Sequence, residues 1–116
     1  MLAMLRRRKK KKSGIRDADQ PIDCSGHRQH VRGYECALEG KTDRDCLGKM
    51  HAHHSRSKGA GGGDDTCVPL CAIHHDLVHT RGQQAVERDT GVRFTKLAEQ
   101  LWKQSPQAIK WRFEHD

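Results

Sequence analysis

The chain has 116 residues, of which 34% are hydrophobic and only 4% aromatic, so its core is thin and a staple such as a metal ion is expected. The sequence shows no secretory signal, in which positive charges would precede a longer apolar region, so its five cysteines are expected to bind metal in a reducing cytoplasm rather than to form disulfides. No apolar run reaches the length of a membrane span, which argues against a membrane anchor. The net charge of +7 arises in residues 6–12, because that run holds seven of the 22 Lys and Arg and the other 15 balance the 15 Asp and Glu.

Residues 1–22 are predicted to form a disordered basic tail, because adjacent like charges repel one another. The tail offers nonspecific, salt-sensitive contacts to nucleic-acid phosphates. The alternative is a solvated tail that has no partner. The candidate contact residues are Arg6, Arg7, Arg8, Lys9 and Lys10.

The segment after the tail is predicted to form short elements. Residues 25–36 suit a short helix or turn, and the charged residues 38–46 are turn-like. Weak alternation over residues 47–54 predicts a strand that ends at a histidine pair. Residues 55–65 contain four glycines and are expected to form a loop.

A second strand and a helix are predicted next. Residues 67–70, "CVPL", suit a short buried strand in which Pro69 lies at an edge or an end. A helix over residues 71–80 follows and is closed by Gly82. The predicted core order is therefore strand, glycine loop, strand, helix.

The C-terminal part is predicted to be helical. A short helix covers residues 83–89, and the apolar positions of residues 94–103 repeat with the helical period. Residues 105–116 are expected to form a helical turn or tail that begins near Pro106. Its apolar side chains are expected in the core rather than stacked on bases; they are Ile109, Trp111 and Phe113.

The predicted helix at 71–80 carries ligands for two different metal ions. His75 and His79 are four residues apart and share one face, where two imidazoles can converge on one divalent cation. His74 is turned by about 100° from His75 around the axis and cannot join that ion. It follows Cys71 by three positions, so this pair can bind a second metal.

The second metal needs two more ligands, and Cys36 and Cys46 are the natural candidates. With Cys71 and His74 they complete a tetrahedral Cys3His zinc site, which would supply folding free energy. Two other cysteines, Cys24 and Cys67, compete for these positions, and some cysteines would then be small apolar core residues.

The sequence "HAHH" ends the first predicted strand. Neighbouring residues of a strand point to opposite faces, so His53 and His54 cannot bind one ion in the same way. One of them is expected to join the helix pair at the metal. The other, near Arg56, would stay free to act as a general base on water.

Other motifs are excluded by spacing. A two-Cys, two-His finger needs about a dozen residues between its ligand pairs, but only three separate Cys71 from His75. The residues between His75 and His79 are "DLV", so the protease motif H-E-x-x-H is absent, and the glycine run lacks G-K-[ST].

The stretch "HAHHSRSKGAGGGDDTCVPLCAIHHDLVH" resembles the ββα-metal (His-Me finger) core of HNH endonucleases. It is most similar to the small phage and prophage type, related to phage recombination-enhancement nucleases, and the likeness covers residues 27–104. The resemblance implies an α+β fold: a zinc-stabilised ββα-metal core with additional C-terminal helices, in a nuclease domain over residues 23–104.

The resemblance also implies residue roles. His54 matches the general base, and His53, His75 and His79 match the ligands of one catalytic divalent ion, Mg²⁺, Mn²⁺, or Ni²⁺ or Zn²⁺. Asp64 or its neighbour Asp65 stands where the family has the middle residue of its motif; Asp64 is the candidate, either holding the loop or touching the metal. Arg56 is expected to act beside them as a catalytic residue that stabilises the charge developing in the transition state. Nucleic-acid contacts are expected at Arg56 and Lys58.

The implied function is metal-dependent hydrolysis of DNA phosphodiester bonds with low sequence specificity, because no element is long enough to contact many base edges. A bacterial cytoplasm, phage or prophage DNA processing, and recombination or packaging proteins as partners are the expected setting. The alternative from another class is a noncatalytic zinc-binding nucleic-acid module, which would have no need of a free His54.

Overall fold

The computed structural model describes residues 21–57 and 60–115. The basic run from Arg6 to Lys10 and the candidate contact Lys58 lie outside the described residues. Ile22, which was assigned to the tail, has a defined place, because its carbonyl accepts a hydrogen bond from the backbone N–H of Asp64 at 2.8 Å.

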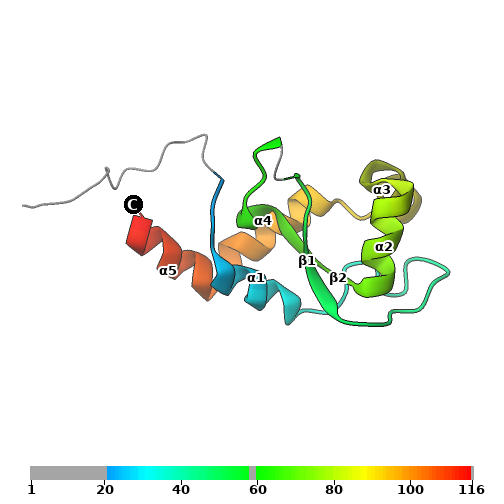
Figure 1. Cartoon of the computed structure of the whole chain (residues 1–116), viewed down its shortest axis with the longest axis horizontal. Coiled ribbons are helices and arrows are strands. Elements are labelled where there is room, and N and C mark those ends of the chain that lie inside the picture. Colours follow the sequence, from blue (N-terminus) through cyan, green and yellow to red (C-terminus); the bar gives the residue numbers. More distant parts are fainter. Residues whose placement is uncertain (1–20, 58–59, 116) are drawn as a thin grey trace, which may run out of the picture.

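Two short antiparallel strands form the centre of the fold (Figure 1). Strand β1 spans Met50–His54 and strand β2 spans Cys67–Cys71, in a register that sets His54 opposite Cys67. The glycine-rich connection ends in a 3-10 turn, η2, at Asp64–Thr66. The pairing of the strands continues one step into this loop, because the N–H of Ser55 donates to the carbonyl of Thr66.

Five helices surround the strands, so the fold is α+β as predicted. In Figure 1, α2 and α3 lie at one end of the sheet, and α1, α4 and α5 gather toward the other. Within the described residues no helix is both long and apolar enough to cross a bilayer. The helices are α1 (Ser25–Arg32), α2 (Ala72–Arg81), α3 (Gln83–Thr90), α4 (Phe94–Gln104) and α5 (Pro106–His115).

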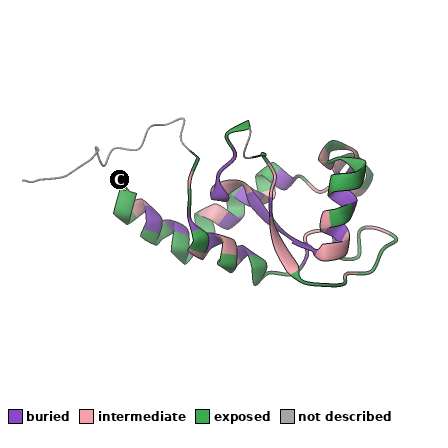
Figure 2. Cartoon of the chain, in the orientation of Figure 1, coloured by how far each residue is buried: buried purple, intermediate pink, exposed green. Residues whose placement is uncertain are grey.

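Strand β2 is buried along its whole length, which is why its sequence is apolar throughout (Figure 2). Val68 and Leu70 pack in the larger core cluster together with Phe94 of α4. Cys67 belongs to a second, smaller cluster with Val31 of α1. Helix α4 contributes to both clusters, which explains the helical period of its apolar residues.

The breaks between the C-terminal helices follow from local chemistry. Gly82 separates α2 from α3 with a φ of 92°, a backbone conformation that side chains other than glycine rarely adopt. The N–H of Phe94, in the first turn of α4, has no partner within its own helix. It donates instead to Oε2 of Glu87 in α3, at 2.7 Å.

The C-terminal segment forms a ten-residue helix, α5, rather than a single turn. Trp111 is buried as expected, and its indole N–H donates to the carbonyl of Asp23 at 3.1 Å. The expectation of core packing is wrong for Phe113 and Ile109, which are 86% and 45% exposed. Ile109 and Phe113 are four residues apart and share one face of α5, whereas the buried residues of this helix are Ala108 and Trp111.

Candidate metal and catalytic site

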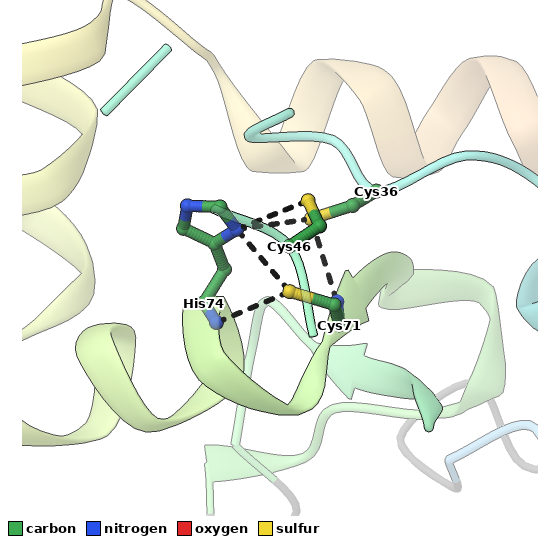
Figure 3. A group of neighbouring side chains, drawn as sticks. All are labelled: Cys36, Cys46, Cys71 and His74. Atoms are coloured by element: carbon green, nitrogen blue, oxygen red, sulfur yellow. Dashed lines mark hydrogen bonds between the residues drawn. The ribbon is translucent and has the colours of Figure 1, made fainter. Parts of the chain in front are cut away.

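Cys36, Cys46, Cys71 and His74 form a cluster that is close enough to bind a metal ion (Figure 3). The three Sγ atoms lie 3.5, 3.5 and 3.3 Å from Nδ1 of His74. A tetrahedral zinc with ordinary bond lengths would separate sulfur and nitrogen ligands by about 3.6 Å. The donor set and its spacing therefore fit a structural zinc.

The start of α2 positions two members of this cluster. Cys71 ends β2 and is also the N-cap of α2, where its Sγ accepts from the N–H of His74 at 3.4 Å. The imidazole of His74 is held from its outer side, because Nε2 lies 2.7 Å from Oγ1 of Thr42. This hydroxyl leaves Nδ1 as the nitrogen that faces the sulfurs.

The thiols of the cluster have divergent acidities. Burial, together with the hydrogen bonds that its thiol donates to Cys71 and Cys36, raises the pKa of Cys46 to about 12. Burial also acts to raise the pKa of Cys71, but the backbone N–H groups of His74 and Leu47 outweigh it and lower that pKa. Cys71, at a helix N-terminus, is thus the group in the cluster best suited to be a thiolate.

The two competing cysteines lie elsewhere. None of the five cysteines forms a disulfide. Sγ of Cys24 faces the carbonyl of Gln107 at 3.8 Å, and Cys67 groups with His54 and Asp64. The Cys3His cluster therefore consists of the four predicted residues.

A second group of potential ligands consists of His53, His75 and His79. Nε2 of His79 lies 3.0 Å from Nε2 of His75, which matches the separation of about 3.0 Å expected for two imidazoles at right angles around one ion. Exposure increases from the buried His53 to the exposed His79, so the group lies at the protein surface and opens to solvent.

The fold lowers the pKa of two of these imidazoles, those of His53 and His75. Burial, followed by the neighbouring histidines, lowers the pKa of His75 to about 4. Burial also lowers the pKa of His53, and a hydrogen bond with Gln83 only partly opposes this effect. Both rings are therefore neutral at pH 7, which is the form that binds a metal.

His54 points to a different partner from His53, as expected for neighbours in a strand. Its Nε2 lies 3.0 Å from Oδ1 of Asp64 in η2. A carboxylate can only accept, so Nε2 carries the hydrogen in this contact and Nδ1 keeps a free lone pair. The arrangement leaves His54 able to take a proton at Nδ1.

Asp64 is held by three donors from separate parts of the chain. Oδ2 accepts the backbone N–H of Cys24 at 2.6 Å and also contacts the guanidinium of Arg28. Burial acts to raise the pKa of Asp64, but these donors and the hydrogen bond from His54 outweigh it and hold that pKa below its ordinary value. Asp65, its neighbour in the sequence, makes none of these contacts.

The glycines before Asp64 allow this approach. A Cβ on Gly62 would overlap the carbonyl of Arg56, and one on Gly63 would overlap the backbone N of Ile22. The glycine-rich loop thus packs closely on two backbones, and Asp64 reaches His54 as a result.

His53, His75 and His79 all line one cleft, which has a volume of about 920 Å³. His54 lies on its wall, and also on the wall of a smaller cavity of about 520 Å³ that contains Arg28 and Asp64. Two arginines from α2 and α3, Arg81 and Arg88, line the larger cleft. Positive charge beside neutral imidazoles suits an anionic ligand such as a phosphate.

The predicted site residues thus fall into three sets. The structure brings together the four ligands of the first cluster, the three histidines of the second, and the pair His54 and Asp64. It does not bring Arg56 to them, since Arg56 is exposed in the loop after β1 and is not among the residues that line the cleft.

Sequence reasoning missed four residues that hold the site in place: His51, Gln83, Arg28 and Thr42. The one signal available was in "HAHH", where His51 and His53 are two apart and share a strand face. The other three come from distant segments without any motif of their own.

Comparison of the chain with models of known protein families, with curated proteins and with solved structures returns no match in any of the three.

Proposed function

We propose that the protein is a metal-dependent DNA endonuclease with a zinc-stabilised ββα-metal core of the HNH type. One observation carries the proposal: the ligand atoms of His53, His75 and His79 lie within 4.8 Å of one another in the same cleft as His54, whose own ring is held by Asp64. A structural role alone would explain the cysteine cluster, but not a second ligand group that opens to solvent.

His54 is the general base in this proposal. With Nε2–H donating to Asp64, Nδ1 accepts a proton from a water molecule beside the scissile phosphate. Asp64 fixes the tautomer and stabilises the imidazolium that forms, which is the role of the buried carboxylate in Ser-His-Asp triads. Arg28 keeps Asp64 ionised throughout.

His53, His75 and His79 would hold the catalytic ion, which as Mg²⁺, Mn²⁺, Ni²⁺ or Zn²⁺ supplies Lewis-acid stabilisation of charge on the phosphate and the leaving oxygen. Arg81 and Arg88, which line the same cleft, would contact the phosphate backbone. The longest described helix, α4, has 11 residues, so we expect few contacts to base edges and cleavage of DNA with low sequence specificity.

The basic run before Pro21, with Arg56 and Lys58, would add nonspecific phosphate attraction. A phage or prophage origin, a bacterial cytoplasm and a recombination or packaging partner remain part of the proposal.

Nicking of supercoiled plasmid tests the proposal. Zinc-loaded protein with added Mg²⁺ or Mn²⁺ is expected to relax the plasmid, and His54→Ala to lower the rate by a factor of about 10³. His115→Ala, which removes an exposed histidine far from the cleft, should cut like the parent. Circular dichroism and zinc content should be equal in all three proteins.

Two outcomes would contradict the proposal in different ways. Cleavage by His54→Ala at the parental rate would refute the general-base role. A zinc-loaded parent that binds DNA but cuts with none of the four metals would instead support the noncatalytic nucleic-acid module.

A further inference from the structure

We propose that Gln83 and His51 are positioning residues that fix the tautomers of His53 and His75, so that each presents a lone pair to the second ligand group. The inference rests on the metal site of the proposed function for His51, whereas the hydrogen-bond role that it assigns to Gln83 exists before any ion binds. Its evidence is the geometry on the outer side of each ring.

Gln83 determines the state of His53. The amide nitrogen of Gln83 donates to the carbonyl of Ser55 at 3.0 Å, which fixes the orientation of the amide. Its Oε1 therefore faces Nε2 of His53, at 2.9 Å. An amide oxygen can only accept, so Nε2 carries the hydrogen and Nδ1 is the nitrogen left with a lone pair.

His51 determines the state of His75. The two Nδ1 atoms lie 2.9 Å apart, so one of them must donate to the other. Nε2 of His75 is on the opposite side of the ring and faces His79. If this Nε2 binds an ion it carries no hydrogen, so Nδ1 of His75 donates and Nδ1 of His51 accepts.

The local structure explains why His51 and Gln83 lie beside the rings that they contact. His51 precedes His53 by two positions in β1, so both side chains lie on one face of the strand. Gln83 is the first residue of α3, directly after Gly82, and the turn at this glycine brings it back to the end of β1. The first residue of α3 thus supports the ligand group through its contact with His53.

The expected effect on metal binding is substantial. A neutral imidazole has two tautomers of similar energy, and the wrong one presents N–H to the ion. Outer partners of ligating histidines typically change metal affinity by about 10- to 100-fold. We expect Gln83→Ala and His51→Phe each to weaken binding of the second metal by a factor in this range.

The first experiment measures the tautomers directly. Nitrogen-15 shifts of the histidine rings in the full, zinc-loaded chain at pH 7, without a second metal, report which nitrogen carries the hydrogen. We expect Nε2–H in His53, and loss of this preference in Gln83→Ala. The opposite tautomer of His53, or an equal mixture of its two tautomers in the parent, would overturn the role of Gln83 whether or not an ion binds.

The second experiment titrates Ni²⁺ into tag-free, zinc-loaded protein by calorimetry, because Ni²⁺ binds imidazole strongly. Gln83→Glu should keep most of the parental affinity, since its carboxylate also accepts from His53. Gln84→Ala is the matched control, because Gln84 is the exposed next residue of α3. Its affinity should equal that of the parent.

Failures of the two proposals differ. Parental Ni²⁺ affinity in both Gln83→Ala and His51→Phe would refute the positioning roles and leave the metal site intact. A parent that binds no second ion, with Nε2–H observed in His53, would refute the metal site of the proposed function together with the role of His51, and leave the role of Gln83 intact.

Discussion

Asp64 connects a catalytic candidate to the framework of the protein, since its two oxygens receive His54 on one side and Cys24 N–H and Arg28 on the other. Removing the carboxylate leaves a buried N–H and a half-buried guanidinium without their acceptor. Such losses cost about 1–3 kcal/mol each. Asp64 therefore contributes to stability as well as to the orientation of His54.

We expect Asp64→Ala to lower the free energy of unfolding by about 3 kcal/mol, measured by urea denaturation of zinc-loaded protein at pH 7. Asp65→Ala is the matched control, since it removes a neighbouring carboxylate that does not contact His54, and should cost less than about 1 kcal/mol. Equal losses in the two variants would contradict the network described for Asp64.

The sequence could not separate Asp64 from Asp65, because both lie in one short turn and no periodicity distinguishes them. Residues far away in the chain determine which of the two carboxylates is held beside His54: Arg28, which contacts Asp64, lies 36 residues before it. The same reason explains why Gln83 was missed. In contrast, the spacing of His75 and His79 on one helix face was enough to predict their proximity.

At the scale of elements, α1 contains an unusual buried group. His27 is fully buried against the edge of Trp102, and neither ring nitrogen has a hydrogen-bond partner within residues 21–57 and 60–115. Burial, followed by the charge of His30, lowers the pKa of His27 to about 4, although Asp64 opposes the shift. In the folded protein His27 is neutral at pH 7.

The pH dependence of stability follows from this shift. Between pH 6.5 and about 4 the unfolded chain binds a proton at His27 that the folded protein does not, so the free energy of unfolding falls as the pH drops through this window. In His27→Phe this contribution is absent. Relative to the parent, the variant should gain about 2 kcal/mol between pH 7 and pH 5.

Urea unfolding at the two pH values, with zinc content verified at each, measures this difference. A stability difference between His27→Phe and the parent that does not change with pH would show that His27 titrates normally in the folded state.

The helices themselves were largely predictable. Apolar residues at the helical period marked α4, and glycines marked the ends of α2 and α3. Helix α5 was underestimated because it has only a short buried face, built on Trp111, while Phe113 is exposed. A pattern of apolar residues does not reveal which of them a neighbouring element covers.

At the scale of the whole molecule, the Cys3His cluster joins two segments that are distant in the sequence. Cys36 and Cys46 come from the irregular connection between α1 and β1, and Cys71 and His74 from the start of α2. A metal ion here would fix that connection against the helix that carries His75. Much of the stability is then expected to depend on the metal.

Removal of zinc should therefore unfold the domain. We expect one zinc per chain that resists dialysis, and loss of helical circular dichroism once a strong chelator has stripped it. Cys36→Ser should reduce zinc content and the melting temperature, whereas Cys24→Ser, a buried thiol outside the cluster, should keep its zinc. Native helical signal after verified zinc loss would contradict a structural role.

The hydrogen bond from Trp111 to the carbonyl of Asp23 has an implication for the order of assembly. Asp23 directly precedes Cys24, whose N–H donates to Asp64. Helix α5 therefore holds the backbone that positions Asp64, the partner of His54. During synthesis the ribosome releases Cys24 well before it makes α5. The backbone that positions Asp64, and through Asp64 the ring of His54, therefore gains this support only after α5 has been made.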